Sequence, residues 1–331
     1  MALTLRYRLP NRAWRSALAL LLAACCVHVS VQAAESDPRG VELMEHMKRA
    51  AHALDYAGVF TYQQGAVMAS SQVAHVVDKQ GERQRVETLD GRPHREFLRL
   101  NDEVRSIYPE LRMVLVEKRE TEHFPVFFHG EARTLAQHYA ITLEDETGRV
   151  AGRACRVLHV QPRDDARWGY ELCVDEASGL LLKAQTVDAS GAVLEQVAFS
   201  EVRIGKDVDP ALVEPRHDIS AWREVQPGDP VDLLAAGWRI PAPQGFVPLS
   251  QMERTLKHDK HVRQMLLSDG IAAISVFIEN RRGADSRTPG PTEYGATSVY
   301  CRQLDDFWLT VIGEVPLATV QGIANAIEFI Q

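Results

Sequence analysis

The chain lacks the short motifs that mark many catalytic and cofactor sites. Its 331 residues contain no GxSxG, HExxH, CxxC or P-loop pattern. It also lacks a basic excess, since the formal net charge is −8, whereas a nucleic-acid-binding surface is basic. We therefore expect no enzymatic activity, no cofactor, no metal site and no nucleic-acid partner.

The chain has no apolar run long enough to cross a membrane as a helix. The apolar run at 16–27, SALALLLAACCV, follows four arginines and precedes the small residues VQA that end at Ala33. This pattern predicts a secretory signal at 1–33, a soluble mature protein and export to the periplasm. The alternative is LAAC at 22–25, which has the form of a lipoprotein signal and would anchor the protein at Cys25.

Few cysteines remain after the signal: Cys155, Cys173 and Cys301. Cys155 and Cys173 lie in two runs that flank the turn-like segment PRDDAR. We predict a disulfide between them, facing each other across a hairpin centred near Asp164, because an exported protein can keep a disulfide. The alternative is a pair of buried free thiols, since a register slip of one residue would separate the sulfurs.

Helical and strand-like patterns divide the mature chain into two parts. Asp37 and Pro38 are typical of a helix start, and apolar residues follow at helical spacing up to Leu54. Short runs rich in Val, Tyr, Phe and Thr then continue to about residue 204 and predict an antiparallel sheet. We expect a first domain at 34–206, a Pro-rich linker with little regular structure at 207–230, and a smaller α+β domain at 231–331. In that second domain, 281–295 reads as a mobile loop and 317–330 as a closing helix.

Apolar residues on the predicted strands suggest a cleft for an apolar ligand. Each residue taken alone reads as ordinary core, but a curled sheet with a helix can leave a concave apolar surface. The segment HFPVFFHG at 123–130 has weak strand alternation and reads as a half-exposed lid. The candidate cleft residues are Phe60, Tyr62, Val76, Phe97, Ile107, Val114, Val116, Phe124, Phe127 and Phe128.

Six stretches are specific when taken together. They are YAGVFTYQQG at 56–65, HVVDKQGERQRVETLDGRPHRE at 75–96, the long run at 150–202, IPAPQGF at 240–246, LLSDGIAAISVFIE at 267–279 and TVIGEVP at 310–316. In these stretches the chain resembles the RseB/MucB family of periplasmic regulators of the envelope-stress sigma factor. The family pattern has an aromatic residue where Cys173 stands, so a disulfide would be a local feature of this chain.

The resemblance implies a fold of the α+β class. Its first domain would be an unclosed antiparallel β-barrel with helices, similar to the lipoprotein carriers LolA and LolB, followed by the smaller α+β domain. The run WGYELCVDEASGLLLKAQTVDASGAVLEQVAFSEVRIG at 168–205 would then form one wall of that barrel.

The resemblance also implies a function. The protein would be a negative regulator that binds the periplasmic part of a membrane anti-sigma factor, RseA or MucA, and shields it from site-1 proteolysis. A lipid or lipopolysaccharide signal would release it. The alternatives are a periplasmic lipid or lipoprotein carrier and a hydrolase with an unrecognised motif. The sequence leaves open whether the protein forms homo-oligomers.

Overall fold

The structure is a computed structural model that describes residues 35–90, 94–118, 124–226, 228–256, 260–281 and 287–330. The predicted signal at 1–33, with its alternative anchor Cys25, lies outside these residues. Within them, no helix combines the length and apolar character needed to cross a membrane.

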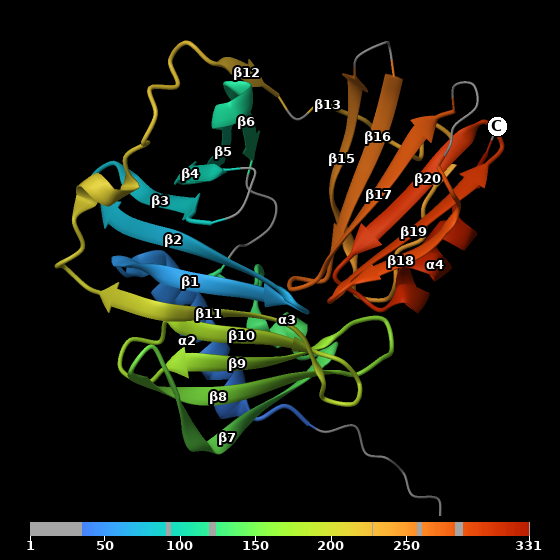
Figure 1. The fold of residues 1–331 in the computed structure, drawn as a ribbon. Coiled ribbons are helices and arrows are strands. Elements are labelled where there is room, and N and C mark those ends of the chain that lie inside the picture. The colour runs from blue at the N-terminus through green and yellow to red at the C-terminus, as the bar shows by residue number, and fades with distance from the viewer. Residues whose placement is uncertain are drawn as a thin grey trace, which may run out of the picture. The chain divides into compact units, whose positions relative to one another are not determined.

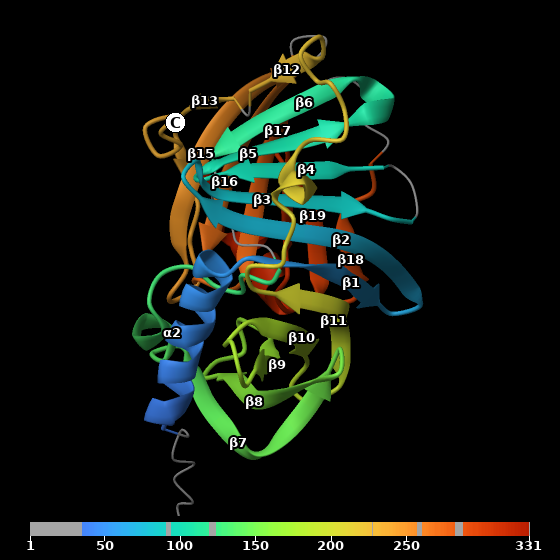
Figure 2. The ribbon, with the colours of Figure 1, turned by 90° about the vertical axis from the view of Figure 1, so that its left-hand side faces the viewer.

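The first helix, α2 (Pro38–Ala53), begins where the sequence predicts. The Asp37 side chain accepts a hydrogen bond of 2.8 Å from the Arg39 backbone N–H. Pro38 lies in the first turn, where a backbone N–H has no partner within the helix, so the N–H that proline lacks is not needed. The buried face of α2, which carries Met44, Met47 and Ala51, packs in the core formed with the first sheet. Figures 1 and 2 show α2 beside strands of the first sheet.

The first sheet has twelve strands in the order β12-β6-β5-β4-β3-β2-β1-β11-β10-β9-β8-β7. All neighbours are antiparallel except β12, which runs parallel to β6. No pairing joins β12 to β7 among the described residues, so the sheet is unclosed, and the predicted α+β class with an open antiparallel sheet is confirmed. Its strands are β1 (Tyr56–Gln64), β2 (Val67–Asp78), β3 (Gly81–Thr88), β4 (Glu96–Leu100), β5 (Glu103–Tyr108), β6 (Met113–Lys118), β7 (Tyr139–Val150), β8 (Arg153–Pro162), β9 (Gly169–Asp175), β10 (Leu181–Val187), β11 (Val193–Ile204) and β12 (Arg223–Val225). Two short helical segments, η1 (Pro109–Leu111) and α3 (Ala132–Leu135), lie between these strands.

The second sheet has seven strands in the order β13-β15-β16-β17-β20-β19-β18. A helix, α4 (Leu317–Ala326), covers it, and Val320 and Ile323 of that helix are buried in the core of this part. The strands are β13 (Asp229–Pro230), β15 (Val247–Leu256), β16 (Lys260–Ser268), β17 (Ala273–Asn280), β18 (Gly290–Tyr294), β19 (Thr297–Leu304) and β20 (Phe307–Gly313). A separate two-stranded pair joins β14 (Trp238–Arg239) to β21 (Glu328–Phe329).

Two predictions for the second part were wrong in detail. The closing helix ends at Ala326 rather than 330, because the chain turns into β21, where Phe329 packs 4.7 Å from Trp238 and 5.2 Å from Phe307 between ring centroids. The stretch 290–294, expected to be loop, forms β18. Pro291 is compatible with a strand there because β18 is at the edge of the sheet, where a missing N–H costs least.

The segment expected to be a linker carries short elements that tie it to both sheets. It contains η2 (Pro210–Val213), β12 and β13. Val208 and Val213 pack against Ala57, Ala74 and Val76 of the first sheet. The side chain of Glu214 accepts a 2.7 Å hydrogen bond from Arg83, so the chain from 208 to 225 follows the outer face of the first sheet. The domain boundary at 206 stays a prediction.

The cysteines pair with a register that differs from the predicted one. Val160 lies opposite Tyr170, so the β8–β9 hairpin is centred on Asp165 rather than Asp164. Cys155 therefore lies opposite Asp175, and Cys173 is its diagonal neighbour on the same face. A disulfide joins Cys155 to Cys173, with their Cα atoms 5.4 Å apart. Cys301 is free and half-buried.

Candidate ligand cavity

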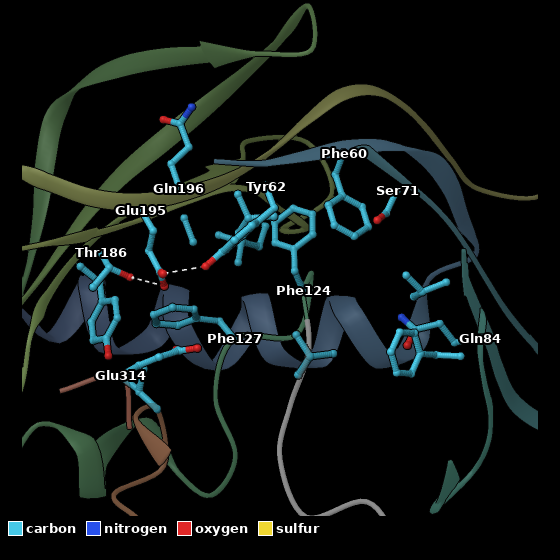
Figure 3. A pocket seen from close by; sticks show the side chains of 18 of the residues that line it. Phe60, Tyr62, Ser71, Gln84, Phe124, Phe127, Thr186, Glu195, Gln196 and Glu314 are labelled. Atoms are coloured by element: carbon cyan, nitrogen blue, oxygen red, sulfur yellow. Dashed lines mark hydrogen bonds between the residues drawn. The ribbon is translucent and has the colours of Figure 1, made fainter. Parts of the chain in front are cut away.

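A cavity of about 420 Å³ lies against the inner face of the first sheet. Its walls are mostly apolar or aromatic, and they come from eight neighbouring strands of the first sheet, from the segment 124–127 and from two turns of the second sheet. Figure 3 shows most of the labelled side chains pointing into this space, whereas Gln196 points away from it. The lining residues are Phe60, Tyr62, Ser71, Gln84, Val86, Phe97, Leu98, Arg99, Val104, Phe124, Val126, Phe127, Tyr170, Leu181, Ala184, Thr186, Glu195, Gln196, Val197, Ile271 and Glu314.

Strand alternation explains which side chains reach the cavity. Phe60 and Tyr62 are two apart on β1 and share one face, and Val86 lies directly opposite Phe97 on the same face. Phe124 packs against these strands. Its ring centroid lies 5.2 Å from that of Phe60 and 4.9 Å from that of Phe199. This part of the wall is therefore a cluster of aromatic edges and faces, which suits an apolar chain.

Half of the predicted cleft residues line the cavity: Phe60, Tyr62, Phe97, Phe124 and Phe127. The other five do not line it. Val76 is next to inward-facing His75 and so points to the outer face, where it packs against Val208 and Val213. The outer face also takes Ile107, Val114 and Val116, because Ile107 lies opposite Glu96, the neighbour of inward-facing Phe97. Whether the five lining residues bind a ligand stays a prediction.

The segment 123–130, predicted to be a half-exposed lid, contains both buried and partly exposed residues. Residue 123 lies outside the described residues. Phe124 and Phe127 are partly exposed and line the cavity, whereas Phe128 is only 1% exposed and belongs to the core around α2. The sequence gives three similar aromatic residues within five positions, and nothing in it separates the buried one from the two that face the cavity.

One end of the cavity carries two carboxylates. Glu195 accepts hydrogen bonds from the hydroxyl of Tyr62 (2.7 Å), the side-chain amide of Gln64 (3.2 Å) and the hydroxyl of Thr186 (3.3 Å). Burial and the hydrogen bond to Glu195 raise the pKa of Tyr62, so this hydroxyl stays protonated and continues to donate.

Glu314, from the turn after β20, reaches the same end of the cavity (Figure 3). Its side chain is exposed to solvent, although many protein atoms lie around its carboxyl group. Burial and the negative charge of Glu195 raise the pKa of Glu314 to about 7. Protonated and ionised forms of Glu314 therefore coexist near neutral pH.

The other end is built on Glu82 of β3. His52 of α2, His75 of β2 and Arg99 of β4 all contact the same oxygen of the Glu82 carboxylate, at 2.9 Å for His52 and 3.0 Å for His75. Burial opposes ionisation of Glu82, but the hydrogen bonds from the two histidines and the positive charge of Arg99 outweigh it and lower the pKa of Glu82. Glu82 is therefore ionised, and Arg99 and Gln84 line the cavity beside it.

A buried ion pair fixes the loop that brings the second sheet to the cavity. Arg167 donates to Asp269 at 2.8 Å, and both side chains are 0% exposed. Tyr139 donates its hydroxyl to the same oxygen at 2.7 Å. Asp269 in turn accepts from the backbone N–H groups of Ile271 (2.9 Å) and Ala272 (2.8 Å). The ion pair thus holds the turn that places Ile271 in the cavity wall.

The cavity-lining residues that sequence reasoning missed are mostly polar or distant in the chain. Val86 follows from the same alternation that identified Phe97, but Arg99, Glu195 and Glu314 each look like ordinary surface charges in the sequence. Only the fold brings Glu195 and Glu314 to one end of the cavity.

Comparison with known proteins gives matches over both parts of the chain. Residues 39–217 match the family model for the MucB/RseB N-terminal domain, and residues 233–328 match the model for the MucB/RseB C-terminal domain. The sigma factor AlgU regulatory protein MucB of Pseudomonas aeruginosa is 30% identical over 327 residues, which are 95% of this chain and 97% of that protein. The sigma-E factor regulatory protein RseB of Escherichia coli K12 is 25% identical over 302 residues, 89% of this chain and 92% of that protein.

A similar solved structure is a complex. The crystal structure of MucB in complex with MucA(peri) has a TM-score of 0.69 and 25% identity, and the match covers 88% of this chain and 99% of the solved one. These similar proteins are named as regulators, and none of the names denotes an enzyme.

Proposed function

Because this chain belongs to the MucB/RseB family, we propose that it is a periplasmic negative regulator that binds the periplasmic part of a membrane anti-sigma factor. While bound, it shields that segment from site-1 proteolysis, so the sigma factor stays sequestered. A lipidic signal that occupies the cavity releases the segment. The single observation that carries this proposal is the match, over 88% of the chain, to MucB in complex with periplasmic MucA.

Release by a ligand follows from linkage. A ligand lowers the affinity for the anti-sigma segment only if it binds the free protein more tightly than the complex. The cavity offers such a site, because its wall contains residues of the first sheet together with Ile271 and Glu314 from turns of the second. Filling it would change the contacts between the sheets that a bound segment needs.

The direct test is binding of the full mature chain to the periplasmic segment of a MucA-like or RseA-like anti-sigma factor, by calorimetry and by pull-down. The same mixtures are then exposed to the site-1 protease. We expect the bound segment to be cleaved more slowly, and addition of an acylated ligand to restore cleavage. Absence of binding, or binding that leaves the cleavage rate unchanged, contradicts the proposal.

We expect both sheets to be needed for this binding. The sheets share close contacts: the Gln64 side chain donates to the Tyr294 carbonyl at 2.8 Å, and the Trp168 indole donates to the Ala296 carbonyl at 2.8 Å. A shortened protein must keep 207–226, because this segment packs on the first sheet. Residues 35–226 alone should bind the anti-sigma segment more weakly than the full chain, and equal affinity would contradict a role for the second sheet.

A second candidate function is a periplasmic lipid or lipoprotein carrier, which the apolar cavity favours. It predicts that acylated ligands bind equally well with and without the anti-sigma segment. Under the regulator proposal, the segment and the ligand weaken each other's binding by the same factor.

A further inference from the structure

A second cavity, of about 400 Å³, adjoins the first and lies against the second sheet. The two cavities share three wall residues, Phe127, Ile271 and Glu314. The rest of the second wall comes from His129 and from the ends of β16, β17, β19 and β20, and it is more polar than the wall of the first cavity. The second cavity therefore suits a polar group rather than an apolar chain.

Hydroxyl groups and small residues form much of the second cavity. Ser268, Ser275 and Thr297 line it, and Gly270 and Gly313 add no side chain that would fill it. A hydroxyl oxygen has two lone pairs and accepts hydrogen bonds from N–H donors. The cavity thus has both room and acceptors for a long side chain that ends in N–H groups.

Glu314 lies between the two cavities without a cation beside it. No hydrogen bond or ion pair joins its carboxylate to another of the described residues. Among the residues that line either cavity, Arg99 is the one lysine or arginine. Arg99 is directly opposite Gln84, which Figure 3 shows at the end far from Glu314. The negative charge of Glu314 is therefore available to a ligand.

The groups that face Glu314 do not compensate its charge. Glu195 of β11 is a second carboxylate, and burial raises the pKa of Tyr62 of β1 and Tyr170 of β9, so both hydroxyls are neutral. The protein atoms around Glu314 and the charge of Glu195 raise the pKa of Glu314 to about 7. His129 is the one residue lining the second cavity that can gain a positive charge. A cation from outside would stabilise the ionised carboxylate.

We infer that the second cavity binds a basic side chain of the anti-sigma segment, a lysine or an arginine, and that Glu314 pairs with its charge. This inference rests on the proposed function and specifies the chemistry of the partner. The N–H groups of an ammonium or guanidinium donate to Glu314 and to the hydroxyl oxygens of the cavity. The formal net charge of the chain, −8, also favours the approach of a basic segment.

The test measures the affinity of the full mature chain for the periplasmic segment of a MucA-like or RseA-like anti-sigma factor by calorimetry. The segment is also prepared with each lysine and arginine replaced in turn by methionine. We expect one of these replacements to weaken binding roughly tenfold, the effect of one charge-assisted hydrogen bond. Glu314→Gln should weaken binding by a similar factor, and the two changes together should weaken it no further.

Glu176→Gln is the matched control, because Glu176 is exposed in the turn between β9 and β10, and it should bind the segment as the wild type does. Circular dichroism checks that Glu314→Gln is folded. Unchanged affinity in Glu314→Gln overturns the inference, and so does a loss that is additive with the replacement of every basic residue of the segment.

The pH dependence of binding separates Glu314 from His129. The cation pairs with ionised Glu314, whose fraction grows as the pH rises through about 7, so the affinity of the wild type should rise between about pH 6 and pH 8. Loss of a proton from His129 would act in the same direction, because it removes a positive charge beside the cation. Glu314→Gln should therefore have a flat profile, and a rise that persists in this variant overturns the inference.

A small probe tests the site separately from the regulator. In an NMR titration of the full mature chain with labelled glutamate side chains, butylguanidinium should lower the pH at which Glu314 ionises, whereas butanol should leave it unchanged. If the segment does not bind but butylguanidinium has this effect, the regulator is refuted and the pairing of a cation with Glu314 stands. If the segment binds but none of its basic residues couples to Glu314, the regulator stands and the inference is overturned.

Discussion

Replacing Arg167 with alanine should destabilise the protein more than almost any other single loss of charge. Arg167 and Asp269 are paired at 2.8 Å with both side chains 0% exposed, so the substitution leaves Asp269 as a buried carboxylate without its cation. The guanidinium also lies 4.9 Å from the Phe246 ring centroid and 5.5 Å from that of Tyr139, and these contacts are lost as well.

The expected cost is about 3–5 kcal/mol, the range for removing one partner of a buried ion pair. This is a large part of the roughly 5–15 kcal/mol by which typical domains are stable. It corresponds to a fall in Tm of roughly 6–20 °C for a protein of moderate size. Urea denaturation measures the free energy of unfolding. Calorimetry shows whether the two sheets unfold together or separately, because the substitution removes a buried ion pair between the parts of the chain that form them.

Two comparisons decide whether the reasoning holds. Arg239→Ala is the matched control, since Arg239 pairs with Glu328 at 2.9 Å but both side chains are more than half exposed, and such pairs contribute little. Combining Arg167→Met with Asp269→Asn removes both charges and keeps the amide oxygen for the backbone N–H groups of Ile271 and Ala272, so the double variant should be more stable than the sum of the single effects implies. Equal destabilisation by Arg167→Ala and Arg239→Ala would refute the argument.

Three further predictions concern the cavity and the hairpin. Phe127→Asp should weaken binding of acylated ligands while the fold survives, whereas Phe128→Asp should unfold the protein because Phe128 is 1% exposed in the core. Non-reducing digestion and mass spectrometry of the exported protein should find Cys155 linked to Cys173, and two free thiols there would end that prediction. The pKa of Glu314 is raised from 4.5 to about 7, so its contribution to stability is present below about pH 4.5 and is lost as the pH rises through 7, and Glu314→Gln should flatten this dependence.

Each of these measurements has its own control. Circular dichroism separates lost ligand binding from unfolding in the two phenylalanine variants. Glu176→Gln, at an exposed turn, should leave the pH dependence of the unfolding free energy unchanged. A pH profile identical in the wild type and Glu314→Gln would show that Glu314 does not titrate in the expected range.

Much of the first sheet could be predicted because its strands alternate regularly and follow one another through short turns. β1 and β2 span Tyr56–Gln64 and Val67–Asp78, within the series of strand-like runs that the sequence predicts up to about residue 204. β18 was missed because Pro and Gly dominate its local sequence, and only pairing with β19 makes it a strand. The end of α4 was missed because Ile327 and Ile330 continue the helical spacing, while β21 pairing ends the helix.

The sequence predicts the apolar character of the cavity, but it identifies only some of the residues that line it. The sequence identifies apolar strand positions, but it does not say which face of an open sheet is concave. Ile107 and Val114 are as apolar as Phe97, yet they lie on the outer face and are buried. The polar ends depend on residues that are far apart in the chain but near in the fold, such as Glu195 and Glu314, and no local pattern records these.

The way the first sheet ends bears on how the protein avoids self-association. An open sheet has two edges whose unpaired backbone groups can capture a strand from another molecule. At one edge the chain returns on itself, and β12 occupies the backbone of Met113–Leu115 in β6. At the other edge, β7 has an irregular register after Leu143 and carries Glu144, Asp145 and Glu146 in succession. A bulge and like charges disfavour strand addition, so a variant that removes both should aggregate through this edge while its cavity remains intact.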